Sequence, residues 1–271
     1  MRLHVRRLRA HFRDREMNTL RPADIRHYVS LRKQDGVSNA TVNRELEVLS
    51  AAINHANREW EWMLPNPVPG RYLEESEGRL RWISKAEAVS LLRAAAMEKK
   101  APHLPDFVTL ALHTGMRRSE ILGLEWRRVD LQTNLIYLEA EHTKSKKRRS
   151  VPINRTARAS VMNRLRFRAA RCPASPWVFC NEQGERIKDV KRSFATACRR
   201  AGITNFRVHD LRHTCAAWLV TDGVPLSEVR DLLGHSTVTV TERYAHLAPE
   251  NVRSAVQRLD RKRSTNHALF I

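Results

Sequence analysis

The chain has 271 residues, which is enough for two domains, and 42% of them are hydrophobic, as is ordinary for a protein that buries a core. Lysine and arginine number 49 against 29 aspartates and glutamates, so the net charge is +20. This excess favours a polyanionic partner, most often nucleic acid. No apolar run approaches the roughly 20 residues that cross a bilayer, which argues against a membrane protein.

The N-terminal and cysteine patterns both favour the cytosol. The first residues are basic but lack the apolar core of a secretory signal peptide. The spacing of the four cysteines matches no common zinc site, so we interpret them as reduced thiols. Two of them, Cys198 and Cys215, lie in partly apolar helical contexts and are expected to be packing residues.

Residues 1–65 read as a small helical bundle. Leu3, Val5, Leu8 and Phe12 give a short amphipathic pattern. Pro22 and Asp24 suit the first turn of a second helix. Ser38 is a good N-cap for a third helix, which we expect to end near Trp62.

A proline-rich break follows the bundle. Three prolines between Pro65 and Gly70 cannot continue a helix. We therefore predict a linker over residues 66–82, a second domain over 83–262 and a C-terminal tail over 263–271. The alternative is a surface loop within one domain.

The second domain is expected to be mixed. Ser84 and Glu87 form a capping box at a helix start. Two β-prone runs, 135–138 and 149–153, flank a basic segment and predict an antiparallel hairpin with a cationic tip. Residues 156–170 read as a helix, and 177–179 are a candidate strand. The predicted fold class is mainly α with a small antiparallel hairpin or sheet (α+β).

A cluster of histidines and one arginine lies between residues 209 and 213. His209, Arg212 and His213 have the spacing that places side chains on one face of a helix. They could cap or pack an amphipathic helix, or the two histidines could bind zinc with His235. The metalloprotease pattern fails because glutamate does not follow the first histidine, and we expect no metal site.

Tyr244 stands apart from the other tyrosines because its neighbours are cations and imidazoles. A free phenol has a pKa of about 10 and needs nearby positive charge or a proton acceptor to act as a nucleophile. Arg117 and Arg212 could neutralise the oxygens of a phosphate ester, and Glu120 could hold a guanidinium. Lys144, at the hairpin tip, could protonate a leaving oxygen.

Taken together and in order, these motifs resemble the conserved boxes of the tyrosine recombinase (phage integrase) family. The matching segments are Thr114-Gly115-Met116-Arg117-Arg118-Ser119-Glu120, Thr143-Lys144 leading to Arg149-Ser150-Val151-Pro152-Ile153, His209-Asp210-Leu211-Arg212-His213-Thr214, Leu232-Leu233-Gly234-His235 and Tyr244-Ala245-His246. The resemblance covers about residues 80–260. Residues 1–65 look like the family's helical, SAM-like core-binding domain, most clearly from Ser38 to Leu46.

The resemblance implies a role for each motif residue. Arg117 and Arg212 would hold the scissile phosphate, with His235 binding the phosphate or helping to activate the nucleophile. Lys144 would be the general acid for the 5′ oxygen, although Lys146 and Lys147 lie close by, and His209 would assist proton transfer. Tyr244 would attack and form a 3′-phosphotyrosyl link, without ATP, metal or other cofactor.

The resemblance also implies partners. These are a double-stranded DNA recombination site, a homotetramer on that DNA with residues 252–259 docking on a neighbouring subunit, and an accessory directionality or DNA-bending protein. The location would be the cytoplasm of a bacterial cell or phage host. Family members often carry more residues before the first helix, so this is either a minimal member or one with a truncated start.

DNA contacts are expected from both domains. In the bundle, one face could read a groove or could simply be solvated; its residues are Ser38, Thr41, Asn43, Arg44 and Arg58. Near the hairpin tip, Lys146, Lys147, Arg148 and Arg149 are expected to contact phosphates, which position a protein without specifying sequence and weaken with salt.

Two other functions are compatible with parts of the sequence. One is a catalytically idle DNA-binding regulator of the same fold, which is disfavoured because all six catalytic positions carry usable residues. The other is a metal-dependent integrase or nuclease built on acidic residues, which the scattered carboxylates and largely helical pattern disfavour.

Overall fold

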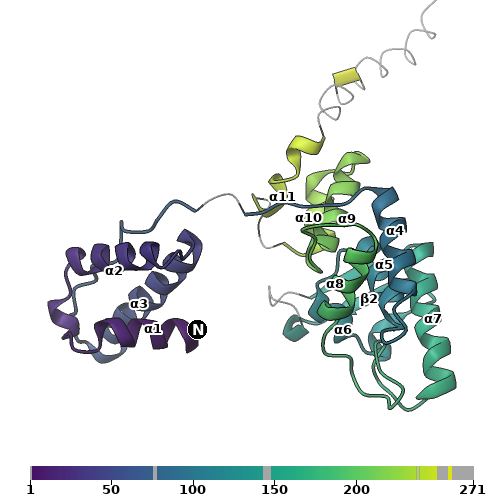
Figure 1. Ribbon diagram of the computed structural model, residues 1–271, viewed down its shortest axis with the longest axis horizontal. Helices are drawn as coiled ribbons and strands as arrows, with labels where there is room; N and C mark the ends of the chain where they lie inside the picture. The colour runs from purple at the N-terminus through teal and green to yellow at the C-terminus, as the bar shows by residue number, and fades with distance from the viewer. Residues whose placement is uncertain are drawn as a thin grey trace, which may run out of the picture. The chain divides into compact units, whose positions relative to one another are not determined.

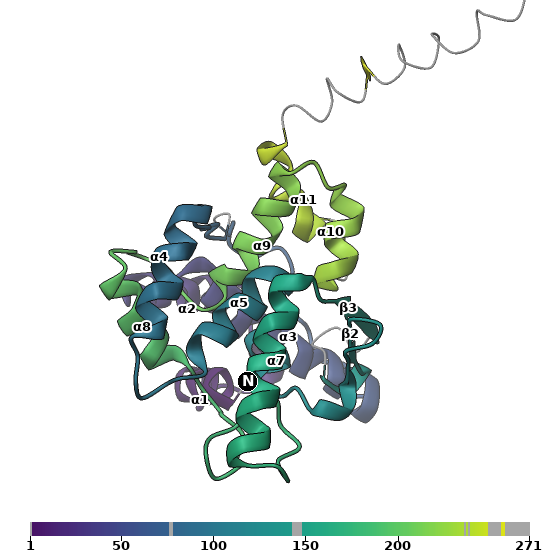
Figure 2. The same ribbon diagram turned by 90° about the vertical axis from the view of Figure 1, so that its right-hand side faces the viewer.

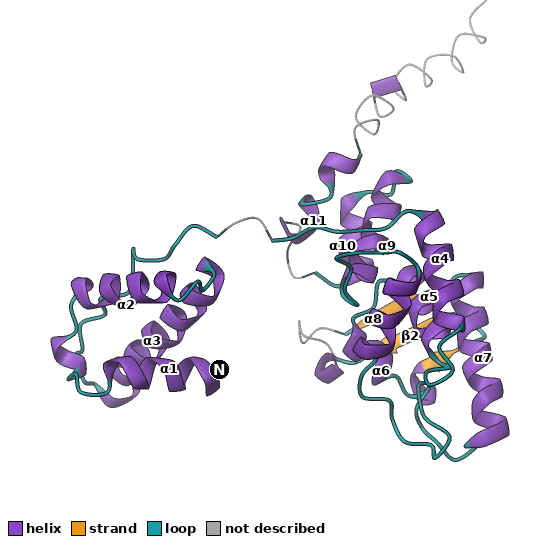
Figure 3. Cartoon of the chain, in the orientation of Figure 1, coloured by secondary structure: helices purple, strands orange, loops and turns teal. Residues whose placement is uncertain are grey.

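The computed structural model describes residues 2–75, 78–142, 148–235, 237, 239–248 and 256–257. The chain divides into two compact units, Met1–Arg79 and Leu80–Ile271 (Figure 1). Strands occur only in the second unit among the described residues (Figure 3). The predicted fold class, mainly helical with a small antiparallel sheet, is confirmed.

The first unit is a helical bundle around one apolar core. Its elements are α1 (Arg2–Phe12), the 3-10 turn η1 (Met17–Thr19), α2 (Pro22–Gln34) and α3 (Asn39–Trp60). The Ser38 hydroxyl accepts a hydrogen bond from the Thr41 amide at 3.4 Å, as its capping role predicts. The helix ends at Trp60, two residues before the expected end, because Glu61 adopts a left-handed backbone conformation.

A buried polar network joins α2 to α3. Glu45 is fully buried and accepts hydrogen bonds from the Tyr28 hydroxyl at 2.8 Å and from Arg32 Nε at 2.9 Å. Burial raises the pKa of Tyr28, and its bond to Glu45 raises it further. Buried ionic groups of this kind need their partners, because an unpaired charge in a core is costly.

Some residues of the predicted 66–82 linker pack against one or the other of the two units. Val68 is fully buried in the core of the first unit, and Leu73 binds α3 through its backbone. Leu80 and Trp82 instead pack in an apolar cluster of the second unit. The division between the units therefore falls after Arg79, near the end of the predicted 66–82 linker.

The second unit contains the remaining helices and the sheet. Its helices are α4 (Lys85–Ala96), α5 (Leu104–Thr114), α6 (Arg118–Leu122), α7 (Arg155–Arg171), α8 (Lys191–Arg200), α9 (Asp210–Thr221), α10 (Leu226–Leu233) and α11 (Thr239–Glu242). Its 3-10 turns are η2 (Trp126–Arg128), η3 (Ala140–His142) and η4 (Ala245–Leu247). Its strands are β1 (Val129–Asp130), β2 (Leu135–Leu138) and β3 (Arg149–Pro152).

The three strands form one antiparallel sheet in the order β1-β2-β3. The predicted hairpin is present as β2 and β3, in the register that pairs Ile136 with Val151. Residues 177–179 do not form the expected strand and make only an isolated bridge between Glu125 and Trp177. The backbone of this segment bonds to the chain around Leu124 instead of to a strand: the Val178 amide donates to the Leu124 carbonyl at 2.9 Å.

Helix α5 organises this unit, since both α7 and α9 pack against it (Figure 2). It is apolar along its length and contributes Leu104, Phe107 and Leu110 to the main core. It ends at Gly115, whose φ of +62° is a conformation that favours glycine. This turn delivers the following residues to the start of α6, where the first predicted site residue lies.

Candidate active site

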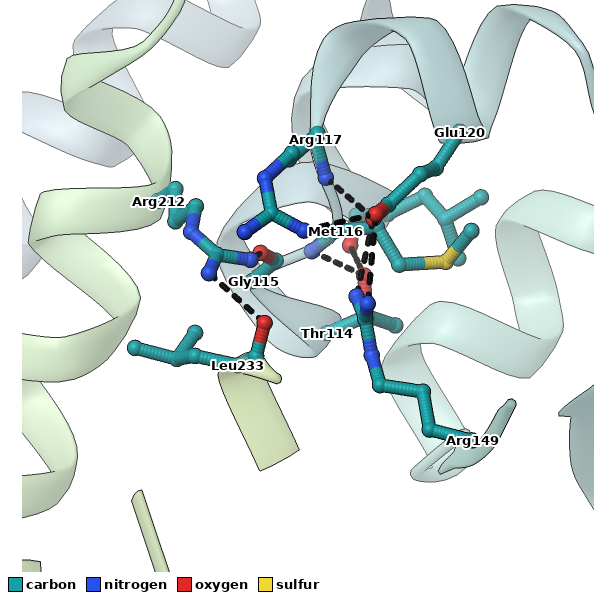
Figure 4. Close-up of polar contacts among 9 residues, drawn as sticks. Thr114, Gly115, Met116, Arg117, Glu120, Arg149, Arg212 and Leu233 are labelled. Atoms are coloured by element: carbon teal, nitrogen blue, oxygen red, sulfur yellow. Dashed lines mark hydrogen bonds and ion pairs between the residues drawn. The ribbon is translucent and has the colours of Figure 1, made fainter. Parts of the chain in front are cut away.

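Arg117 and Glu120 form the first part of the site at the start of α6. The Arg117 amide donates to Glu120 Oε2 at 2.8 Å, and its guanidinium Nη1 donates to Oε1 at 2.9 Å. Arg149, on β3, donates to the same two oxygens at 2.8 and 3.2 Å (Figure 4). Burial raises the pKa of Glu120, but Arg149 and Arg117 together hold it below its ordinary value. The carboxylate is therefore ionised between two guanidinium groups.

Arg212 lies near the start of α9 and is only 4% exposed. Its Nη1 donates to the Gly115 carbonyl at 2.7 Å and its Nη2 to the Leu233 carbonyl at 2.6 Å (Figure 4). Both acceptors lie at the C-terminal ends of helices, where carbonyls carry partial negative charge. Burial, and then the charge of Arg117, lowers the pKa of Arg212 to about 9, so it is still a cation at neutral pH.

His235 follows directly on Gly234, which ends α10 with a φ of +66°. Its Nδ1 is 2.9 Å from the hydroxyl oxygen of Thr241 on α11. Burial, followed by the charges of Arg212 and Arg117, lowers the pKa of His235 to about 3. The imidazole is therefore neutral near pH 7, beside the two arginines.

Tyr244 comes after α11 and is only 2% exposed. It packs in an apolar cluster with residues of α9 and α10, among them Ala217 and Leu233. Its hydroxyl is hydrogen-bonded to Nδ1 of His213. Burial raises the pKa of Tyr244 to about 12, although the charge of Arg212 opposes the rise.

Two histidine rings lie next to one another near the start of α9, and one of them contacts this phenol. His209 immediately precedes α9, and its ring lies 5.0 Å from that of His213 between centroids. Burial, followed by the proximity of His209, lowers the pKa of His213 to about 4. His213 is therefore a neutral hydrogen-bond partner of Tyr244 at neutral pH.

Comparison with known proteins shows to which family the chain belongs. The family model described as "Phage integrase family" matches residues 81–251. The chain belongs to the phage integrase family. It is 32% identical over 234 residues to the integrase of Salmonella phage P22, an alignment that covers 82% of this chain and 57% of that integrase. The chain thus spans less than two thirds of this relative's length.

Solved structures of other integrases share the fold of this chain. The Tn1549 transposon integrase in complex with a circular intermediate DNA has a TM-score of 0.78 at 20% identity, covering 95% of this chain and 93% of that one. A lambda integrase tetramer bound to a Holliday junction has a TM-score of 0.71 at 18% identity, covering 90% and 69%. At these identities the likeness shows the fold.

The structure brings together most of the residues that the family motifs select. Arg117, Arg212 and His235 meet around the carbonyls of Gly115 and Leu233, and the charge of Arg212 reaches Tyr244. The ring of His209 lies next to that of His213, which is hydrogen-bonded to the phenol of Tyr244. Lys144, Lys146 and Lys147 lie outside the described residues, as do 252–255 and 258–259 of the predicted docking segment.

Two residues of the site were missed from the sequence. The sequence offers His213 as a helix-face residue, a candidate zinc ligand and part of a family motif, but nothing in it indicates a contact with a phenol 31 residues later. Arg149 was assigned to DNA phosphates, but its side chain is 9% exposed and pairs with Glu120. The structure contradicts that expectation, because both terminal nitrogens of this buried guanidinium donate to Glu120, whereas Arg117 uses only one terminal nitrogen for the same carboxylate.

The predicted groove-reading face also needs one correction. Asn43 is buried, and its side chain binds the amide and carbonyl of Leu73, both at 2.8 Å. It holds the chain after α3 against the bundle and is not available to a base edge.

The remaining predicted DNA contacts stay predictions, and those among the described residues lie on the surface. The hydroxyls of Ser38 and Thr41 lie 3.0 Å apart. Three arginines make ion pairs with neighbouring glutamates: Arg44 with Glu47, Arg58 with Glu59 and Arg148 with Glu139. Exposed pairs of this kind are weak, so the arginines can exchange a glutamate for a phosphate.

Within the described part of the chain, no three His, Cys, Asp or Glu side chains gather as metal ligands. In the same residues, no helix is both long and apolar enough to cross a membrane. All four cysteines are buried as free thiols, and Cys172 and Cys180 lie with their sulfurs 3.3 Å apart.

Proposed function

We propose that this protein is a site-specific recombinase that cuts and rejoins DNA strands through a covalent link to Tyr244. The observation that carries the proposal is the pair of hydrogen bonds made by Arg212. By binding the carbonyls of both Gly115 and Leu233, this arginine holds the end of α5 and the end of α10 around itself. Arg117 and His235 thereby lie next to Arg212 around one position, and the charge of Arg212 reaches Tyr244.

A DNA phosphate suits that position. Two guanidiniums match the oxygens of a phosphodiester and neutralise the charge that develops on them during transfer. His235 is neutral at physiological pH and can bond the same phosphate without adding charge. Because these groups supply the electrostatic stabilisation, the reaction requires no metal ion.

In the proposed reaction the phenol oxygen of Tyr244 bonds to phosphorus while the bond from phosphorus to the 5′ oxygen breaks. The products are a 3′-phosphotyrosyl link and a free 5′ hydroxyl, and the reverse attack by a 5′ hydroxyl rejoins a strand. The phenol proton passes to an imidazole, for which His213 and His209 are the nearby acceptors. Lys144 supplies the proton to the leaving 5′ oxygen.

The proposed partner is double-stranded DNA carrying a recombination site, bound by a homotetramer with an accessory DNA-bending or directionality protein. The net charge of +20 supports a polyanionic partner. The solved lambda integrase tetramer on a Holliday junction, which shares this fold, supports the assembly. The proposed location is the cytoplasm of a bacterial cell or phage host.

Covalent capture tests the proposal. The protein is incubated in EDTA with nicked duplexes taken from the DNA that flanks its gene, and a protein–DNA adduct is sought on a denaturing gel. We expect an adduct that Tyr244→Phe abolishes. Tyr137→Phe is the matched control, because Tyr137 is an exposed tyrosine of β2 and should form the adduct normally.

The other outcomes separate the alternatives. Tight binding to a site without any adduct would indicate a catalytically idle regulator. Cleavage that appears only with Mg²⁺ would indicate an acidic, metal-dependent enzyme. Either result contradicts the proposed function.

The role of Lys144 has its own test. A substrate with sulfur in place of the 5′ oxygen releases a thiolate, which needs no general acid because a thiol has a pKa of only about 8.5. We expect Lys144→Ala to be slow on the oxygen substrate and restored on the sulfur substrate. Arg117→Ala should be slow on both, since it lacks a phosphate ligand rather than a proton donor.

A further inference from the structure

We propose that Arg149 is a positioning residue for strand transfer, which sets Arg117 through Glu120 and supports the turn that carries His235. The inference rests on the proposed function, because it assigns a task within that reaction. Arg149 does not touch the phosphate in this proposal. It acts on two residues that do.

The first contact is with the carboxylate that holds Arg117. Arg149 donates to both oxygens of Glu120, at 2.8 and 3.2 Å, and Arg117 donates to the same two oxygens at 2.8 and 2.9 Å. Glu120 is fully buried at its side chain, so it has little freedom to bind Arg117 differently. A bidentate pair on one side of the carboxylate therefore fixes the direction in which its other contacts point (Figure 4).

The second contact is with the end of α10. A Cβ atom placed on Gly234 would lie 2.8 Å from Nη1 of Arg149 and 2.9 Å from its Cδ. The guanidinium thus lies directly on the turn between Leu233, whose carbonyl binds Arg212, and His235. One side chain from β3 therefore contacts both Glu120, which holds Arg117, and the turn that carries His235.

The neighbouring arginine shows that this is a property of Arg149 and not of the basic hairpin. Arg148 immediately precedes β3, and Arg149 is the first residue of that strand. Arg148 has a side chain 83% exposed and pairs with Glu139, whereas that of Arg149 is 9% exposed. Of the two, only Arg149 is directed toward the site.

The charge of Arg149 is also felt at His235. Four groups from three elements lower the pKa of this histidine: Arg212 and His213 on α9, Arg117 before α6 and Arg149 on β3. Thr241 on α11 contacts its ring without a charge. Neutralising Arg149 should therefore raise the pKa of His235, whereas a lysine in its place should leave that pKa nearly unchanged.

Lysine should nevertheless fail to position Arg117. An ammonium group is a single point charge and cannot bond two carboxylate oxygens in the fixed fork of a guanidinium. Arg149→Lys keeps the positive charge but loses the fork of the guanidinium, whereas Arg149→Gln loses the charge as well. Comparing the two variants therefore separates the effect of geometry from that of charge. Arg164→Lys and Arg164→Gln are matched controls: Arg164 is an equally buried arginine, on α7, that donates to the carbonyls of Val178 and Cys180.

The first measurement needs no DNA. The titration of His235 is followed by NMR of histidine-labelled protein, with its signal identified by loss in His235→Gln. We expect a raised pKa in Arg149→Gln and a wild-type value in Arg149→Lys and both Arg164 variants. An unchanged titration in folded Arg149→Gln would overturn the contact with the His235 turn. If Arg149→Gln does not fold, the charge-retaining Arg149→Lys carries the second measurement.

The second measurement is single-turnover adduct formation on the nicked site at saturating DNA, with the Kd measured separately. We expect Arg149→Lys to slow cleavage by about 100-fold, the effect of misplacing a reacting group by about 1 Å, with an unchanged Kd. A weakened Kd with normal cleavage would show a phosphate contact, and a rate equal to that of Arg164→Lys would show a purely structural role; both overturn the proposal. If the wild-type protein forms no adduct, the proposed function fails, while the His235 titration still decides the positioning role.

Discussion

The hydroxyl of Tyr244 is hydrogen-bonded to Nδ1 of His213, which joins the segment after α11 to α9. The ring of Tyr244 is buried in an apolar cluster, and its hydroxyl oxygen is the only polar atom of the side chain. A buried hydroxyl that loses its partner costs about 1–3 kcal/mol. The proposed nucleophile is therefore held in a position from which it must be released to reach DNA.

His213→Ala should loosen this segment. Without the imidazole, the buried hydroxyl is unsatisfied, and the segment from Thr239 to Leu247 should open more often. Hydrogen–deuterium exchange of its backbone amides should become faster than in the wild-type protein. His113→Ala is the control, because this half-buried histidine binds Asn154 instead. Equal exchange in both variants would show that the His213 bond does not restrain Tyr244.

Glu120→Ala should be strongly destabilising. The substitution leaves Arg117 and Arg149 without their shared carboxylate, and breaking a buried ion pair typically costs about 3–5 kcal/mol. Urea denaturation measures the loss in the free energy of unfolding. Glu98→Ala, which breaks the partly exposed pair with Arg200 at 3.2 Å, should cost less than about 1 kcal/mol. Similar losses for the two variants would contradict the special role of the buried carboxylate.

Gly115→Ala should damage the site through a clash with Leu233. An added Cβ would clash with Leu233 Cδ2, so the Leu233 side chain would have to move and disturb the packing beside the carbonyl that binds Arg212. Gly202→Ala controls for backbone strain, since its φ of +70° is similar but nothing lies within 4 Å of an added Cβ. We expect Gly115→Ala to cost about 1–3 kcal/mol more than Gly202→Ala in the free energy of unfolding.

Leu233→Ala tests the cause of that difference. In the double variant Gly115→Ala/Leu233→Ala, the colliding methyl group is gone, so the two losses of stability should not add. Additive losses would show that the effect of Gly115→Ala does not come from this contact.

The protein should lose stability as the pH falls below about 6.5, the ordinary pKa of histidine. Burial lowers the pKa of His103 to about 4, of His213 to about 4 and of His235 to about 3. Because the unfolded chain binds protons at these residues before the folded protein does, their contribution is complete above pH 6.5 and is lost as the pH falls toward these lowered values.

Thermal unfolding measures this effect across the range from about pH 7.5 to about pH 5, above the ordinary pKa of carboxylates. The Tm should fall with pH over this window. Of these three histidines, His103 is the one outside the proposed active site. The substitution His103→Gln should make the fall in Tm smaller. A Tm that is flat across this window would contradict the lowered pKa values.

Local features of this protein could be predicted from the sequence because their causes lie within a few residues. Ser84 and Glu87 form the predicted capping box, since both partners lie in one helical turn. The hairpin follows from two β-prone runs, and the family from motifs whose order and spacing are linear properties of the chain. The pairing of Arg117 with Glu120, three residues apart, is of the same kind.

Only the tertiary structure decided which distant residues meet. The sequence presents Arg148 and Arg149 as equivalent cations, yet Arg148 lies in solvent just before β3, whereas the first residue of β3, Arg149, lies on Glu120. It presents Asn43 as a surface residue, yet packing of the proline-rich segment buries it. Strand register and long-range packing set these contacts, and both depend on partners about 30 residues away or more, which no local pattern specifies.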